Sequence, residues 1–151
     1  MKIAFIISTM SHGRGGHFHD LKNISNALIR TTECFIINIG PRKSPILKEA
    51  QCKVYNIEFN GLRIFKMLKE LFQIFAKETP DVVQSFDLSS YGIGRLVAVI
   101  KKIPIIFTKC GGANPSSFFP EFENMVLMSM ENYEFFNSNY SGKKIAYIPN
   151  R

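Results

Sequence analysis

The sequence contains no tryptophan, few cysteines and no long apolar run. Its three cysteines, Cys34, Cys52 and Cys110, lack the Cys-x-x-Cys spacing of a zinc or redox site. Such a set favours reduced thiols, as in the cytoplasm. The opening apolar stretch spans only about five residues, whereas a signal peptide needs roughly 7–15 and a membrane-spanning helix needs ~18. We therefore expect a cytoplasmic protein.

The length of 151 residues and the hydrophobic content of 46% are typical of one ordered domain with a single core. The formal net charge of +7 is concentrated in residues 1–109, which carry 16 basic against 8 acidic side chains. This distribution favours an anionic neighbour, which could be a phosphate group, an acidic lipid or a nucleic acid. Charge alone does not choose among the three.

Apolar runs of strand length alternate with segments of helical periodicity along the whole chain. The expected strands are 2–9, 34–40, 53–59, 81–86, 104–109, 124–130 and 143–149, and the expected helices are 17–30, 62–77, 91–102 and 131–136. This alternation is typical of β-α-β units, which build a parallel sheet with helices on both faces. The predicted fold class is α/β: a Rossmann-like, doubly wound, mostly parallel sheet in a single domain over 1–151.

The loop after the first expected strand, SHGRGGHFHD, is rich in glycine. It does not fit the dinucleotide fingerprint GxGxxG. Counted from Gly13, the third glycine is replaced by Phe18, and counted from Gly15, the second is replaced by His17; no phosphate-loop lysine follows. Gly15 and Gly16 nevertheless open a helix, where backbone N–H groups and the helix dipole favour an anion such as a diphosphate. The alternative, left open by the sequence, is that the glycines only permit a tight turn.

Three histidines in the same loop, His12, His17 and His19, raise the question of a metal site. Zinc takes three or four protein ligands, and no cysteine lies nearby. His17 and His19 are two positions apart, so a helix would point them in different directions. We therefore expect these histidines to bind no metal, and to lie on the surface or to contact a substrate.

Several short segments carry a more specific signal when their order is considered. They are KIAFIIST followed by GGHFHDLKNISNAL, then KETPDVVQSFD, IPIIFTKCGG, NMVLMSMENYEFF and KKIAYIPNR. In order and spacing, these segments resemble the N-terminal half of family 4 glycosyltransferases with the GT-B fold. The resemblance extends over nearly the whole chain.

The resemblance implies that the chain is the acceptor-binding domain, and that the C-terminal, donor-binding domain of the family is absent. The implied reaction transfers a sugar from a nucleotide-sugar to a glycan or lipid-linked acceptor, in surface polysaccharide or glycolipid assembly. The nucleotide-sugar is then a co-substrate, and no cofactor is expected. The chain alone is expected to be inactive. Two alternatives stay open: a non-catalytic acceptor- or membrane-binding subunit of a split enzyme, and a small Rossmann-type domain for another anion.

The resemblance also assigns roles to two loops. It places Gly15 and Gly16 against the donor diphosphate. It places Gly111 and Gly112 on the acceptor side of the cleft, and a histidine of the first loop, His17 or His19, would line the same side.

Potential catalytic residues are harder to assign. Cys110 stands where the family has the histidine of its "HG" motif, and Gln84 and Phe86 stand where it often has histidines, so no general base carries over. The candidates that remain in the matched segments are Cys110, Asp87 and Glu131.

The segment 62–77 predicts an amphipathic, basic helix. Its expected apolar face carries Ile64, Phe65, Leu68, Leu71, Phe72 and Phe75, and the cations of the other face are Arg63, Lys66, Lys69 and Lys77. One interpretation is a core-packed helix with a solvated face. The other is a membrane face that attaches to anionic lipid headgroups, as lipid-glycosylating members of the resembled family do. We expect no nucleic-acid partner, because the aromatics do not alternate with Lys and Arg along an exposed run.

Overall fold

The computed structural model describes residues 1–9, 15–60, 63–115 and 119–149. The elements, in chain order, are β1 (Lys2–Ser8), α1 (Gly16–Leu28), β2 (Glu33–Gly40), the 3-10 helix η1 (Ile46–Glu49), β3 (Lys53–Glu58), α2 (Ile64–Glu78), β4 (Val82–Ser85), α3 (Leu88–Lys101), β5 (Ile105–Lys109), β6 (Asn124–Leu127), α4 (Met130–Asn139) and β7 (Lys144–Tyr147). Each strand and helix expected from periodicity is present, and η1 is the one described element that periodicity missed.

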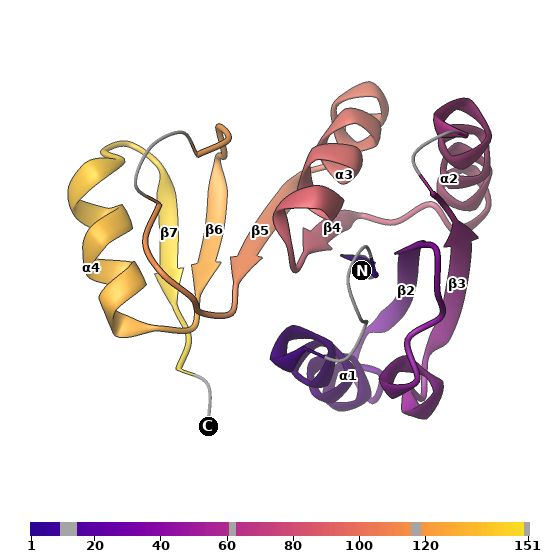
Figure 1. Ribbon diagram of the computed structural model, residues 1–151, viewed down its shortest axis with the longest axis horizontal. Coiled ribbons are helices and arrows are strands. Elements are labelled where there is room, and N and C mark those ends of the chain that lie inside the picture. The colour runs from indigo at the N-terminus through magenta and orange to yellow at the C-terminus, as the bar shows by residue number, and fades with distance from the viewer. Residues whose placement is uncertain (10–14, 61–62, 116–118, 150–151) are drawn as a thin grey trace.

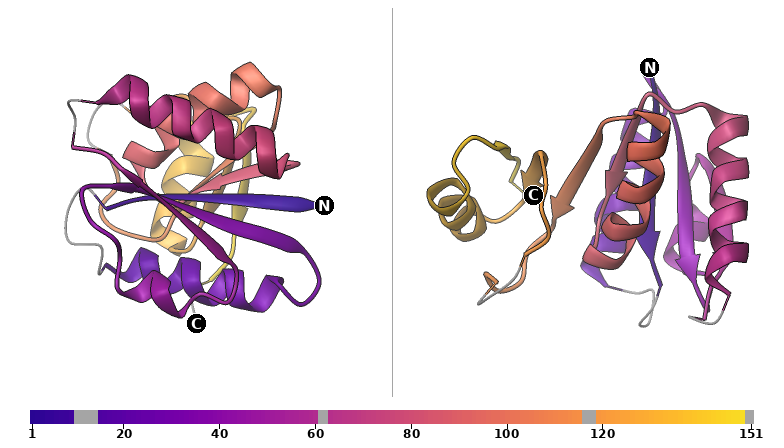
Figure 2. Two further views of the ribbon diagram at one scale, coloured as in Figure 1. Left: turned by 90° about the vertical axis from the view of Figure 1, so that its right-hand side faces the viewer. Right: turned by 90° about the horizontal axis from the view of Figure 1, so that it is seen from above.

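In the described residues the strands form one sheet in the order β3-β2-β1-β4-β5-β6-β7, and every neighbouring pair is parallel. The chain starts at the centre, winds outward to β3 and then crosses back to β4 and onward to β7. Figure 1 shows α2 and α3 on one side of the sheet and α1 on the other. Figure 2 (left) shows the strands lying between α2 and α1. The predicted Rossmann-like, doubly wound fold is confirmed.

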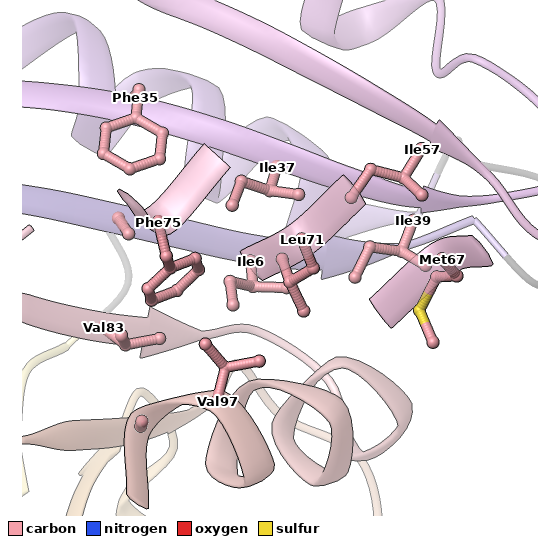
Figure 3. Close-up of a cluster of buried hydrophobic side chains, with 12 residues drawn as sticks. Ile6, Phe35, Ile37, Ile39, Ile57, Met67, Leu71, Phe75, Val83 and Val97 are labelled. Carbon is pink, nitrogen blue, oxygen red and sulfur yellow. The ribbon is translucent and has the colours of Figure 1, made fainter. Parts of the chain in front are cut away.

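Both faces of the central strands are buried, which is why these strands read as continuous apolar runs. On one face, Met67, Leu71 and Phe75 of α2 pack over β1 and β2, close to Val97 of α3 (Figure 3). On the other face, Phe18 and Leu21 of α1 join the second cluster. Each such side chain contributes about 1.5–3 kcal/mol on burial.

The buried face of α2 differs from the expected one. Met67, Leu71 and Phe75 recur every four residues and lie on the sheet, with exposures of 2% or less. The prediction was wrong for Ile64 and Phe65, which are 48% and 86% exposed. Phe65 precedes Met67 by two residues, and two residues on a helix are about 200° apart, so the two side chains point in opposite directions.

The described part of the chain contains no helix long and apolar enough to span a bilayer. Two helices end in the left-handed conformation, α2 at Thr79 (φ 44°) and α3 at Lys102 (φ 56°). Pro80 follows Thr79, as expected for a residue that stops a helix.

Candidate functional site

A cavity of about 620 Å³ opens where β4 and β5 end and α1 begins. Parallel α/β sheets bind their ligands at this carboxyl edge. The wall is formed by Gly16, His17, Asp20, Phe86, Asp87, Leu88, Phe107, Thr108, Lys109, Cys110, Gly111, Gly112, Ala113, Pro115 and Phe119. The structure therefore brings the first turn of α1 and the loop after β5 into one site, which we call the main cavity.

The two glycines that open α1 differ in their surroundings. Gly15 caps the helix with φ −69° and ψ 165°, and Gly16 is the first helical residue. Neither has a positive φ, and a Cβ placed on Gly16 would meet nothing within 4 Å. Neither backbone conformation nor packing therefore requires glycine at 16. With glycine at this position, no side chain stands between the main cavity and the backbone at the start of α1, where an anion is favoured.

The two described histidines of the loop point to different places. His17 lines the main cavity, and its ring lies against Phe18 with the ring centroids 4.6 Å apart. His19 is exposed and is not part of the wall. Among the described residues, no group of three or more His, Cys, Asp or Glu side chains is arranged to hold a metal ion. His12 lies outside the described residues.

Cys110 lies on the wall beside Asp20, which projects from the first turns of α1. Burial, followed by the nearby Asp20 carboxylate, raises the pKa of the Cys110 thiol to about 12. Near neutral pH the thiol therefore keeps its proton. A protonated thiol is a weak hydrogen-bond donor and cannot act as a general base.

The loop after β5 is held by two side chains that donate to its carbonyl groups. Lys109 Nζ donates to the carbonyls of Gly111 and, at 3.1 Å, of Gly112. Asn132 of α4 donates to the Gly112 carbonyl at 3.1 Å and to Asn114 Oδ1 at 2.7 Å. Because Gly112 has a positive φ of 82°, the turn suits glycine. Burial lowers the pKa of Lys109. These hydrogen bonds connect the described start of the loop to Lys109 and to α4.

The other two candidate carboxylates have different surroundings. Asp87 is the N-cap of α3, and its Oδ1 accepts from the Ser90 N–H at 2.9 Å. Its Oδ2 accepts from the Ser8 N–H and the Ser90 hydroxyl, each at 2.8 Å. Glu131, in the first turn of α4, is exposed and does not line the main cavity. The Asp87 carboxylate therefore connects β1 to the start of α3. Glu131 lies outside the wall of the main cavity.

The cations expected to form a membrane face lie elsewhere. Arg63, Lys66, Lys69 and Lys77 are all exposed on α2 or at its start. Lys66 faces Glu70 at 3.8 Å. None of the four lines the main cavity. Any role of this face is therefore separate from ligand binding in the main cavity.

A parallel, doubly wound sheet with a cavity at its carboxyl edge defines the class of Rossmann-like ligand-binding domains. Residues 2–139 match the family described as "Glycosyl transferase 4-like", and the chain belongs to this family. No curated protein matches the sequence significantly. The family expected from the segment order is confirmed.

Solved structures of glycosyltransferases share the fold. The match to the glycosyltransferase from Rickettsia africae ESF-5 covers 99% of this chain and 42% of that one, with a TM-score of 0.76 at 17% identity. The match to the lipopolysaccharide outer core galactosyltransferase WaaB covers 99% of this chain and 46% of that one, with a TM-score of 0.73 at 18% identity. The match to Anabaena HepE, solved with UDP and glucose, covers 99% of this chain and 44% of that one, with a TM-score of 0.73 at 15% identity. The chain thus spans less than half the length of these proteins.

Sequence reasoning missed several polar residues of this region, among them Asp20, Lys109 and Asn132. Asp20 lies four positions after Gly16, one helical turn away on the same face, so helical periodicity could have placed it in the site. Lys109 ends a strand inside a segment that already carried the family resemblance. Asn132 gave no local signal, because its partners are 18 and 20 residues away in the chain.

Proposed function

We propose that the chain is the N-terminal, acceptor-binding domain of a glycosyltransferase that uses a nucleotide-sugar donor and a glycan or lipid-linked acceptor. Family membership supports the reaction class, and the length of the solved relatives supports a second, donor-binding half. The observation that carries the proposal is the open first turn of α1 on the main cavity, where Gly16 leaves the backbone bare.

The main cavity has distinct surfaces for the two substrates. The N-terminus of α1 provides backbone N–H groups for the diphosphate of a donor held by the other half. Asp20 and Lys109 provide polar partners for sugar hydroxyls, and Phe119 provides an aromatic surface for an apolar sugar face. Cys110, protonated at neutral pH, contributes no base. In this proposal the chain positions substrates, and the transfer needs the donor-binding half.

Acceptor binding can be tested on the 151-residue chain itself. We expect a panel of oligosaccharides and lipid-linked sugars to contain a ligand that saturably shifts the backbone amide NMR signals of Gly16, Asp20 and Gly112. If no saccharide shifts these signals while an unrelated anion does, the chain is a Rossmann-type domain for another ligand and the proposal fails. The reading frame after Arg151 separates the two arrangements of the enzyme: a continuing frame with a Glu-x7-Glu motif supports one polypeptide, and a stop codon supports a split enzyme.

One observation favours the alternative of a membrane-binding subunit. Phe65, 86% exposed, stands among Arg63, Lys66 and Lys69 on the outer side of α2. An exposed aromatic among cations is typical of surfaces that attach to anionic bilayers. In this alternative the protein is cytoplasmic and peripheral on the inner face of the membrane. The two proposals are compatible, because the main cavity and the outer side of α2 share no residue.

A further inference from the structure

A second cavity, of about 250 Å³, lies at the carboxyl ends of β2 and β3. Its polar wall is formed by Asn38, Arg42, Lys43, Asn56 and Glu58. It shares no lining residue with the main cavity, although both open at the same edge of the sheet. We call it the side cavity.

Two asparagines face each other across the strands at this point. Asn38 of β2 and Asn56 of β3 are register partners, and Asn38 Nδ2 donates to Asn56 Oδ1 at 3.1 Å. Asn38 Nδ2 also donates to the Arg42 carbonyl at 3.2 Å. Asn38 is 1% exposed, and its Oδ1 has no hydrogen-bond partner among the described residues. A buried acceptor without a donor is rare in native proteins and costs free energy until one is supplied.

The amide pair offers both kinds of hydrogen-bonding group. Asn38 Oδ1 needs a donor, and Asn56, whose Oδ1 already accepts from Asn38, retains its NH2 group as a donor. A sugar hydroxyl both donates and accepts, so neighbouring hydroxyl groups on one ring complement this pair. The volume is below the roughly 300–1,000 Å³ of sites for drug-sized ligands, which suits a single ring.

The loop beside the asparagines carries positive charge in a fixed conformation. Thr9 Oγ1 donates to the Arg42 carbonyl at 2.6 Å. Gly40 has φ 154°, and a Cβ there would collide with Thr9 Oγ1, so the backbone passes close to Thr9, the residue after β1. The Arg42 and Lys43 side chains are exposed, and they outnumber the one carboxylate of the wall, Glu58. The side cavity therefore has a net positive charge.

We propose that the side cavity binds one acidic sugar ring, a hexuronic acid, through its hydroxyls at the amide pair and its carboxylate at Arg42 and Lys43. A carboxylate matches the planar, two-pronged guanidinium of arginine better than a neutral hydroxymethyl group does. As an extension of the acceptor site the role rests on the proposed function, but the binding itself does not depend on any transfer reaction.

The test is an NMR titration of the 151-residue chain with D-glucuronate, with D-glucose and inorganic phosphate as reference ligands. We expect glucuronate to shift the side-chain NH2 signals of Asn38 and Asn56 saturably. We expect it to bind up to about fivefold more tightly than glucose, which is the upper end of what one exposed ion pair provides. Arg42→Gln should remove this preference, and Asn56→Ala should weaken both sugars. Lys48→Gln, which removes an exposed cation of η1 outside the wall, is the matched control. It should change neither the preference for glucuronate nor the affinity for either sugar.

Two results would overturn the inference. If glucose binds as tightly as glucuronate, the cations do not select an acidic sugar. If phosphate reproduces the shifts of Asn38 and Asn56 with equal affinity, the loop is a general anion patch and not a sugar site. Failure of the proposed function looks different, because it leaves the Gly16, Asp20 and Gly112 signals unmoved by any saccharide, whatever happens at Asn38.

Discussion

The backbone N–H of Ser8 donates to Asp87 Oδ2 at 2.8 Å, across a separation of 79 residues. Asp87 also caps α3 through the Ser90 N–H. One carboxylate thus joins the end of β1 to the start of α3, next to the main cavity. Ser8 is the last residue of β1, and Asp87 follows the neighbouring strand β4, so this hydrogen bond connects the ends of the two strands beside the cavity wall.

We predict that Asp87→Ala lowers the free energy of unfolding by about 2–4 kcal/mol. A lost N-cap costs about 0.5–2 kcal/mol, and hydrogen bonds to a charged group contribute about 1.5–3 kcal/mol each. Urea unfolding followed by circular dichroism measures the change, and Ser89→Ala, at an exposed position of α3, is the control. If Asp87→Ala abolishes saccharide binding at unchanged stability, the carboxylate serves the ligand and not the fold.

Glu78 lies at the opposite edge of the sheet. We predict that its ion pairs make the free energy of unfolding fall at acid pH. Its carboxylate accepts from Lys2 Nζ at 2.6 Å, from Lys53 Nζ at 2.9 Å and from the Tyr55 hydroxyl. The hydrogen bond from Lys2, followed by those from Tyr55 and Lys53, lowers the pKa of Glu78 from 4.5 to about 2. A lowered folded-state pKa stabilises the protein fully above the unfolded value, and this stabilisation is lost as pH falls from about 4.5 to about 2.

The measurement is the urea midpoint at neutral pH and at acid pH within this range. Glu78→Gln should lower the midpoint at neutral pH and reduce its fall on acidification. Glu134→Gln, at an exposed position of α4, should keep the wild-type pH profile. A Glu78→Gln profile that runs parallel to the wild-type profile would contradict the prediction.

The sequence predicted the elements well because each depends on local pattern. Strands buried on both faces give apolar runs, and their alternation with helical periodicity specifies the parallel sheet. The amphipathic pattern was less exact for α2, because Phe65 is apolar yet points away from Met67 and the sheet. Apolar periodicity predicts which side chains of a helix are buried, but at the ends of the helix this prediction can be wrong for one or two residues, as it is for Ile64 and Phe65.

The site was predicted in part. Gly16, Gly111 and Gly112 were placed by loop position and family resemblance, and all three line the main cavity. The hydrogen bonds from Asn132 to the β5 loop, and from Asn38 to Asn56, depend on pairing between distant segments. No local pattern encodes such pairing, so only the folded structure brings these groups together.

The open space at Gly16 leads to a prediction about the donor. In the protein that contains both halves, Gly16→Val should raise KM for the nucleotide-sugar by about tenfold, because the new side chain shields the N-terminus of α1 from a diphosphate. The same substitution should change the saccharide affinity of the 151-residue chain by less than this tenfold effect on the donor. Gly92→Val is the matched control, since its Cβ also meets nothing within 4 Å but lies on the exposed side of α3. Unchanged donor kinetics would show that Gly16 has no part in donor binding.

The outer side of α2 provides the last prediction, on membrane attachment. Lys66 and Lys69 are exposed beside Phe65, and each cation near an anionic surface contributes about 1 kcal/mol to binding. The double variant Lys66→Glu and Lys69→Glu should therefore weaken co-sedimentation with phosphatidylglycerol vesicles by at least about tenfold. Phe65→Ser should weaken it as well, by removing the apolar anchor.

A matched control separates this surface from net charge. Arg30→Glu with Lys48→Glu changes the charge by the same amount at exposed positions of the α1 and η1 layer, which covers the opposite face of the sheet. This control should bind the vesicles nearly as well as the unaltered chain, because its α2 surface is intact. Equal binding of the unaltered chain to phosphatidylcholine and phosphatidylglycerol vesicles would rule out an electrostatic membrane face. The basic side of α2 would then be a solvated surface over the core formed by Met67, Leu71 and Phe75.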